Sequence, residues 1–225
     1  MRVKFLPVIF AITMIGCSSS SNTNKPKTIS YTIDFEQFDL GNSKIYQSSE
    51  TYFESTLLTY IQQATENTVT SFYATANNRV KIEESDFVED YPNVKGLIIG
   101  SSSNDGQVGL TFNKKLLKAT IEIEQYYNIY YGYDFGSKQV EIRYDCQEYN
   151  EQLEEYVGYS TITANGNRWK GTGKTYRYND DYTAMFIDVP ERNTATFKID
   201  DYRLTLDGLE SERCRIYNIT LEFEK

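Results

Sequence analysis

The 225-residue sequence contains no histidine, although Asp and Glu are plentiful. Histidine is the commonest general base, so its absence excludes a Ser-His-Asp triad, a Cys-His pair and a histidine-based zinc site. Glu122 and Glu124, in "ATIEIEQ", would share one face of a strand with about 7 Å between them. That spacing overlaps the separation of the two carboxylates in inverting glycosidases. Two glutamates on an alternating strand usually form a solvated face, so we expect no catalysis and no enzyme.

A second stretch, "GTGKT" at positions 171–175, looks like the end of a phosphate-binding loop. The complete motif requires a glycine five residues before Gly173, and that position is Arg168. We therefore expect a β-turn there and no cofactor. The chain has 23 Lys and Arg against 32 Asp and Glu, which gives a net charge of −9. Nucleic-acid phosphates require a basic patch, so the sequence predicts no nucleic-acid partner.

Aromatic rings offer a different kind of chemistry, namely ligand stacking. The stretch "EQYYNIYYGYDFG", residues 124–136, holds five tyrosines in eight consecutive positions. If the preceding strand continues with period two, Tyr127 and Tyr131 face the core, whereas Tyr126 and Tyr130 face outward about 13 Å apart. Outward rings at that spacing could stack on a few sugar units. The alternative is that they contact aromatic neighbours across the strands.

The single tryptophan, Trp169, lies in "NGNRWKGTGKTYRYND" between two Gly-rich turns. Its ring, flanked by Arg168 and Lys170, could make a loop-borne ligand contact, with Tyr176 close by in the sequence. The alternative is that Trp169 covers one edge of the core. The candidate ligand-binding residues are Trp169, Tyr126, Tyr130 and Tyr176.

The elements that must position these rings are predicted to be strands. Apolar and polar residues alternate with period two over most of the chain, which is typical of a sheet with one buried face. The clearest inward sets are Ile29, Tyr31, Ile33 and Phe35 near the start, and Leu117, Ala119, Ile121 and Ile123 in the middle. Turns that combine Gly with Asn, Asp or Ser separate the runs. Many short strands with such turns predict an all-β fold, built as an antiparallel β-sandwich.

One segment departs from this pattern and has helical spacing. In "ETYFESTLLTYIQQATEN" the apolar positions Phe53, Leu57, Ile61 and Ala64 recur at intervals of four, four and three. This predicts one short helix near residues 50–64, beginning after Ser48 or Ser49. The threonines in it are poor helix formers.

The N-terminus carries the pattern of an export signal. Arg2 and Lys4 precede an apolar run over residues 5–16, and Cys17 follows directly. Twelve apolar residues are fewer than the roughly 20 of a membrane-spanning helix but fit a secretory signal. The order of charged start, apolar run, Gly and Cys resembles the lipobox of bacterial lipoproteins. The alternative is an ordinary signal peptide with a cysteine by chance.

The lipobox resemblance implies a domain organisation. Residues 1–16 would be the signal peptide, and residues 17–27 a lipidated Cys17 with a flexible polar tether. Residues 28–225 would form a single β-sandwich domain in the cell envelope, lipid-anchored to a membrane and facing outside the cytoplasm. Loss of two basic residues with the signal changes the net charge from −9 to about −11, which favours solubility.

Two cysteines, Cys146 and Cys214, remain in the domain. An exported protein occupies a compartment where disulfides persist, so these two could be bridged. The alternative is two buried free thiols. In the last strand, Cys214 and Ile216 have the opposite parity to Ile219 and Leu221. A β-bulge between Ile216 and Ile219 would turn both sets inward, and without it Cys214 would face out.

Three stretches resemble jelly-roll modules of the galactose-binding-like class, including the carbohydrate-binding modules of secreted hydrolases. These stretches are "IDFEQF" (33–38), "GLIIGSSSNDGQVGLTFNKKLLKATIEIEQYY" (96–127) and "ERCRIYNITLEFE" (212–224). In the last one, the recurrent positions of the family correspond to Arg213, Ile216, Asn218 and Ile219. The resemblance implies that the sandwich is a jelly roll.

The same family often binds calcium between its first and last strands through acidic side chains. Asp34 and Glu36 match the first strand, but Asn218 stands where an aspartate is common. We therefore expect no metal.

These observations predict a non-catalytic, surface-anchored lipoprotein that binds a glycan or another exposed cell-surface ligand. The alternative is a structural or protein-interaction envelope lipoprotein without a small-ligand site. A hydrolase that uses carboxylates alone is the least favoured alternative, because paired acidic motifs on converging loops are missing from the sequence. The predicted partners are a membrane, through the lipid anchor, and a glycan or envelope protein.

Overall fold

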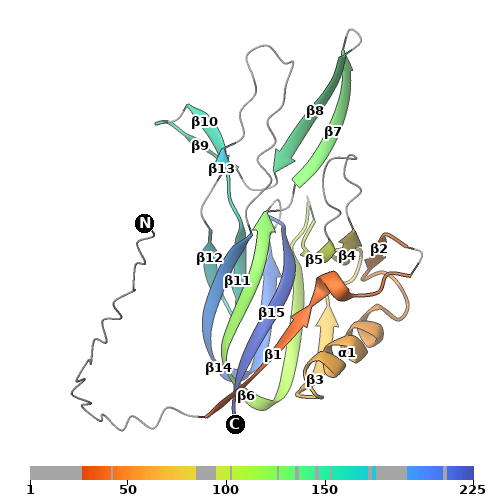
Figure 1. Ribbon diagram of the computed structural model, residues 1–225, viewed down its shortest axis with the longest axis vertical. Helices are drawn as coiled ribbons and strands as arrows, with labels where there is room; N and C mark the ends of the chain where they lie inside the picture. The colour runs from red at the N-terminus through yellow and green to blue at the C-terminus, as the bar shows by residue number, and fades with distance from the viewer. Residues whose placement is uncertain are drawn as a thin grey trace, which may run out of the picture.

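The computed structural model is an all-β protein with one α-helix in its described part (Figure 1). It describes residues 27–41, 43–84, 95–101, 103–125, 127–134, 137–144, 147–152, 154–171, 174–175, 192–209 and 212–225. All strand pairings within these ranges are antiparallel. The predicted antiparallel, sandwich-like all-β fold with one short helix is therefore confirmed.

The main sheet contains ten strands in the order β12-β11-β14-β6-β15-β5-β4-β2, with β1 added beside β15 and β3 beside β6. Two small sheets, β13-β10-β9 and β7-β8, lie at one end of it (Figure 1). The strands are β1 (Thr28–Asp34), β2 (Ile45–Gln47), β3 (Val69–Ala74), β4 (Val80–Glu84), β5 (Lys95–Ile99), β6 (Gly106–Gln125), β7 (Tyr127–Asp134), β8 (Ser137–Tyr144), β9 (Gln147–Asn150), β10 (Glu155–Gly158), β11 (Thr161–Ala164), β12 (Asn167–Lys170), β13 (Lys174–Thr175), β14 (Asn193–Gly208) and β15 (Cys214–Glu224). The helix is α1 (Phe53–Ala64), and a 3-10 turn, η1 (Phe35–Gln37), follows β1.

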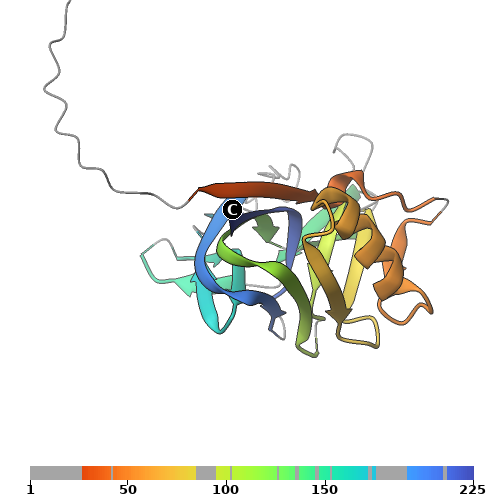
Figure 2. The same ribbon diagram turned by 90° about the horizontal axis from the view of Figure 1, so that it is seen from below.

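The main sheet curls around its apolar face, and α1 lies beside β3 (Figure 2). Two long strands, β6 and β14, allow the sheet to curl. β6 pairs along its length with β14, and on its other edge it pairs first with β3 and then with β15. Register shifts interrupt the β6–β14 ladder between Lys198 and Arg203. Such bulges add local twist and bend a strand, so they allow one sheet to close over its own core.

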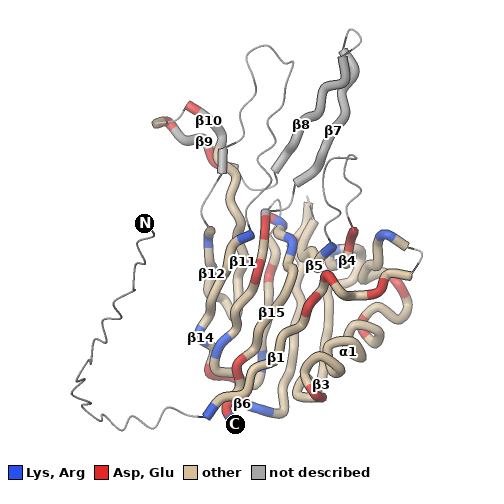
Figure 3. Tube along the Cα trace, viewed as in Figure 1, with Lys and Arg blue, Asp and Glu red and all other residues tan. Residues whose placement is uncertain are grey.

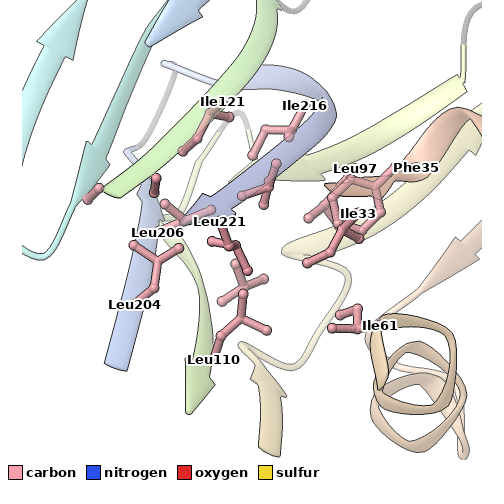
Figure 4. Close-up of a cluster of buried hydrophobic side chains, with 14 of the residues drawn as sticks. Ile33, Phe35, Ile61, Leu97, Leu110, Ile121, Leu204, Leu206, Ile216 and Leu221 are labelled. Atoms are coloured by element: carbon pink, nitrogen blue, oxygen red, sulfur yellow. The ribbon is translucent and has the colours of Figure 1, made fainter. Parts of the chain in front are cut away.

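The core has the composition expected from the alternating pattern. Aliphatic and aromatic side chains of the strands meet those of α1 in a single cluster of buried residues (Figure 4). The residues labelled there are Ile33, Phe35, Ile61, Leu97, Leu110, Ile121, Leu204, Leu206, Ile216 and Leu221. Ile33 and Phe35 are buried as predicted, with Ile29 and Tyr31 partly buried against the cluster.

The helix prediction is confirmed, with a later start. Phe53, Leu57 and Ile61 are buried and Ala64 packs against the core, as the spacing indicated. α1 begins at Phe53, with Tyr52 as its N-cap. Ahead of it the amide of Ser48 donates to the carbonyl of Val80 and the amide of Glu50 to that of Gln47, both at 2.9 Å. Among the described residues, no helix has the length and apolar character needed to cross a membrane.

The bulge predicted in the last strand is present. The β15–β6 register shifts between Ile216 and Asn218. As a result Cys214 and Ile216 are buried in the same cluster as Ile219 and Leu221. Two sets of opposite parity therefore face one core.

The structure corrects two details of strand parity. Leu116, and not Leu117, is fully buried, because Lys118 pairs with Glu222 and Leu116 with Phe223, which leaves Leu117 as the extra residue of a bulge. In addition, β6 does not continue through the tyrosine-rich stretch.

β6 ends at Gln125, and β7 pairs with β8 in a sheet of its own. The parity of the core strand therefore cannot be extended to Tyr127, Tyr130 or Tyr131. Tyr130 lies opposite Glu141 in this hairpin.

Candidate functional site

The structure places Trp169 on β12, an edge strand of the main sheet, opposite Ile162 of β11. Its side chain is partly buried and packs against the core cluster. The indole lies over Gly171, where a Cβ atom would be 2.6 Å from Cη2 of Trp169. Trp169 thus covers one edge of the core, which is the alternative that the sequence left open.

The basic neighbours of Trp169 are held by internal partners. Nζ of Lys170 lies 2.7 Å from Oε2 of Glu148 and 3.8 Å from the ring centre of Tyr159. The contact with Lys170 lowers the pKa of Glu148. Arg168 forms an ion pair with Glu212. These cations are therefore engaged within the protein.

The remaining sequence candidates are not brought together within the described structure. Tyr126, Tyr176 and Cys17 lie outside the described residues, and of Tyr130 only the backbone is described. A shared patch of Trp169 with the three tyrosines stays a prediction. So does lipidation of Cys17.

Cys214 is fully buried and forms no disulfide within the described part of the chain. Burial raises the pKa of its thiol to about 12. The thiol is therefore protonated near neutral pH and chemically inert. Cys146 lies outside the described residues, so the Cys146–Cys214 disulfide stays a prediction.

The two glutamates on β6, Glu122 and Glu124, do not form the solvated face that the sequence predicted. Glu124 is only 2 % exposed, and its Oε1 lies 2.6 Å from Nη1 of Arg215, which is 1 % exposed. The two residues face each other across β6 and β15. Glu124 is thus part of a buried ion pair and not of a solvated face.

Gly96 on β5 makes room for this ion pair. A Cβ atom at Gly96 would lie 2.5 Å from Cγ of Arg215 and 2.7 Å from the carbonyl oxygen of Ile216. Burial raises the pKa of Glu124, and Arg215 opposes that rise. Because the pair is closed to solvent, no substrate reaches the carboxylate, which argues against acid–base catalysis at this position.

A second cation covers the outer side of this cluster. Arg192 binds both carboxylate oxygens of Glu36, at 2.8 and 2.9 Å, and lies 3.6 Å above the ring of Tyr217. It is also 3.7 Å from Glu122, which accepts a hydrogen bond from Asn218. Acidic and basic positions lie together near one end of β6 and β15 (Figure 3).

The family resemblance points to this region for calcium. Asp34 is indeed paired with Asn218 on the neighbouring strand, but Glu36 is engaged by the guanidinium of Arg192. In the described ranges, no group of three or more His, Cys, Asp and Glu side chains could hold a metal ion.

A feature that the sequence reasoning missed is an open cavity of about 500 Å³ along α1. One wall is a single helical face with rings, hydroxyls and an amide. Its residues are Tyr52, Ser55, Thr56, Thr59, Tyr60 and Gln63, and Phe38 and Asp39 complete the described lining. Positions 52, 55, 56, 59, 60 and 63 follow the three- and four-residue spacing that places side chains on one side of a helix.

The floor of this cavity is a cluster of aromatic rings. Phe38 meets Tyr60 edge to face at 5.2 Å and stacks on Tyr46 at 6.0 Å. Tyr46 in turn contacts Phe53 at 5.1 Å. The hydroxyl of Tyr60 donates to the carbonyl of Asp34, and burial raises its pKa. These contacts pack the rings of the floor closely against one another.

The hydroxyls above this floor have defined orientations. Ser55 donates to the carbonyl of Tyr52 at 3.0 Å, and Thr59 donates to the carbonyl of Ser55 at 2.8 Å. Thr56 accepts a bond from Tyr46 at 3.2 Å. A hydroxyl has one donor and two acceptor sites, so each can make a further bond to a ligand.

A sequence signal for the cavity exists. The polar face of the predicted helix is rich in Ser and Thr. These residues form helices less readily than Lys or Glu, so their presence on a polar helical face is a signal.

Comparisons of the chain with models of protein families, with curated proteins and with solved structures find no match.

Proposed function

We propose that this chain is a lipid-anchored, non-catalytic envelope protein whose β-sandwich domain binds a glycan or another exposed ligand. The observation that carries the proposal is the open cavity along α1, which combines aromatic rings with hydroxyl and amide groups. Binding sites typically pair a mostly apolar lining with a few placed polar groups. Saccharides present both kinds of surface.

The anchor is supported by the sequence of the N-terminus. A short apolar run ends in Gly16 and Cys17, and a polar segment follows before β1. Lipid chains on Cys17 would hold the domain at a membrane, and the tether would leave the sandwich free to meet ligands. Metabolic labelling with a fatty-acid analogue tests this, because Cys17→Ser should abolish incorporation.

The contacts of the acidic residues on β6, Glu122 and Glu124, support a binding role without catalysis. The chain has no histidine. Glu124 is closed to solvent by its ion pair, and its neighbour Glu122 is engaged by Asn218 and Arg192. The described part of the chain therefore presents no open pair of carboxylates on β6.

The experiment is a binding screen with the full chain in detergent micelles, on a glycan array and on polysaccharide affinity gels. Retention on a defined glycan, without release of reducing sugar, is the expected result. Absence of retention on every glycan, together with specific recovery of one envelope protein, would favour the structural alternative. Release of reducing sugar would refute the non-catalytic assignment.

A further inference from the structure

We infer that the cavity along α1 is the ligand site of this protein and that it takes an uncharged saccharide. This inference rests on the proposed function and makes it more specific, because it assigns both the site and the class of sugar. The cavity is a different site from the one expected from the sequence, which consisted of Trp169, Tyr126, Tyr130 and Tyr176. Three independent features of the cavity carry it, namely its charge, its ring and its polar rim.

The charge of the lining disfavours acidic sugars. Asp39 is the only ionisable acid or base, apart from the tyrosine hydroxyls, among the eight lining residues that the structure describes. These eight residues include no Lys or Arg that could pair with a uronate, a sialate or a phosphate. An anionic sugar would meet one carboxylate and no cation, which is unfavourable at short range. A neutral sugar can instead donate hydroxyl bonds to Asp39.

The ring that a ligand would meet first is Tyr52, which is 75 % exposed. A large exposed ring at the mouth of a cavity offers a flat apolar face, and the C–H face of a sugar ring matches it. Phe38 and Tyr60, packed edge to face, form the floor of the cavity. Side chains that are already packed lose less conformational freedom when a ligand binds.

The polar rim distinguishes a saccharide from a cationic ligand. Aromatic cages for ammonium groups surround the charge with ring faces. Here the exposed ring is Tyr52, whereas Tyr60 meets Phe38 edge to face and is partly buried. Ser55, Thr56, Thr59 and Gln63 offer donors and acceptors that suit the hydroxyls of a sugar. The volume of about 500 Å³ falls within the range of roughly 300–1,000 Å³ for small-ligand sites.

The test compares neutral and acidic glycans with four versions of the full chain in detergent micelles. The probes are neutral hexose oligomers, galacturonate and mannuronate oligomers, and a trimethyllysine peptide. The variants are Tyr52→Ala, Tyr52→Phe and, as a matched control, Tyr202→Ala, which removes a 52 % exposed tyrosine on β14. Because Tyr52 is so exposed, its variants should keep the wild-type melting temperature.

We expect the wild type to bind neutral oligomers and not uronates. Tyr52→Ala should weaken binding by about three- to tenfold, whereas Tyr52→Phe and Tyr202→Ala should bind like the wild type. Neutral binding that is unaffected by Tyr52→Ala would overturn the site while the proposed function stands. Preference for uronates or for trimethyllysine would overturn the sugar class. No glycan binding at all would overturn both.

Discussion

The buried ion pair of Glu124 and Arg215 gives the sharpest stability prediction. Both side chains are at most 2 % exposed, so neither charge is hydrated when its partner is removed. Removal of one partner from a buried pair costs about 3–5 kcal/mol. We expect Glu124→Gln and Arg215→Met each to lose that amount, which corresponds to a fall in melting temperature on the order of 10 °C. The double variant should recover much of the loss, because no unpaired charge is left.

The chain offers a matched control on the same two strands. Lys118 and Glu222 also face each other across β6 and β15 and form an ion pair, but both are partly exposed. Exposed pairs contribute about 0–1 kcal/mol. Lys118→Met and Glu222→Gln should therefore change the urea midpoint little. The assay is urea unfolding at pH 7 with all single and double variants.

The pH dependence separates the two partners. Burial raises the pKa of Glu124 above its ordinary value of 4.5, and Arg215 opposes this. In Arg215→Met the opposing cation is gone, so the pKa rises further. The folded variant then holds a proton that the unfolded chain releases, and its stability should fall as pH rises from about 5 to 8. Glu124→Gln leaves only an arginine, which does not titrate in this range.

Two results would refute this reasoning. One is a decrease in the free energy of unfolding of less than about 1 kcal/mol in both single variants, which would mean that the pair is hydrated. The other is an equal decrease in the free energy of unfolding of Arg215→Met at pH 5 and pH 8, which would mean that Glu124 takes up no proton.

Three further predictions concern other parts of the main sheet. Gly109→Ala should cost about 1–3 kcal/mol in thermal unfolding, because its Cβ atom would lie 1.8 Å from Cε1 of Tyr73; an unchanged melting temperature would show that the ring moves aside freely. Cys214, which is buried and forms no disulfide within the described residues, should react with iodoacetamide only after denaturation, without added reductant. A failure to react when denatured would instead indicate a disulfide. Arg192→Lys should lose the two-point contact with Glu36 and destabilise by about 1 kcal/mol in urea unfolding, and wild-type stability in this variant would contradict the geometry.

The fold class was predictable because strand periodicity is a local property. Ile33 of β1 and Phe35 of η1 are inward as their parity indicated. The bulge in β15 was also predictable, because two apolar sets of opposite parity can face one core only through an extra residue. The same reasoning identified the inward side of α1 through Phe53, Leu57 and Ile61.

The candidate site was predicted less well. The sequence directed attention to Trp169, which covers the edge of the core, and to tyrosines near and beyond the end of β6. The cavity along α1 requires Phe38 and Asp39, which are distant in sequence from Gln63 at its other end. A helical face of hydroxyls was visible in the sequence, but its approach to Phe38 and Asp39 was not.

By itself, the sequence determined the absence of histidine chemistry, the alternation that makes strands, the helical face of α1 and the parity of β15. Only the tertiary structure decided that Glu124 is buried against Arg215, that Gly96 makes room for that pair, and that β7 leaves the main sheet. The physical reason is the range of the interactions. Alternation determines which side chains share a face, whereas contacts between distant segments determine whether that face meets water.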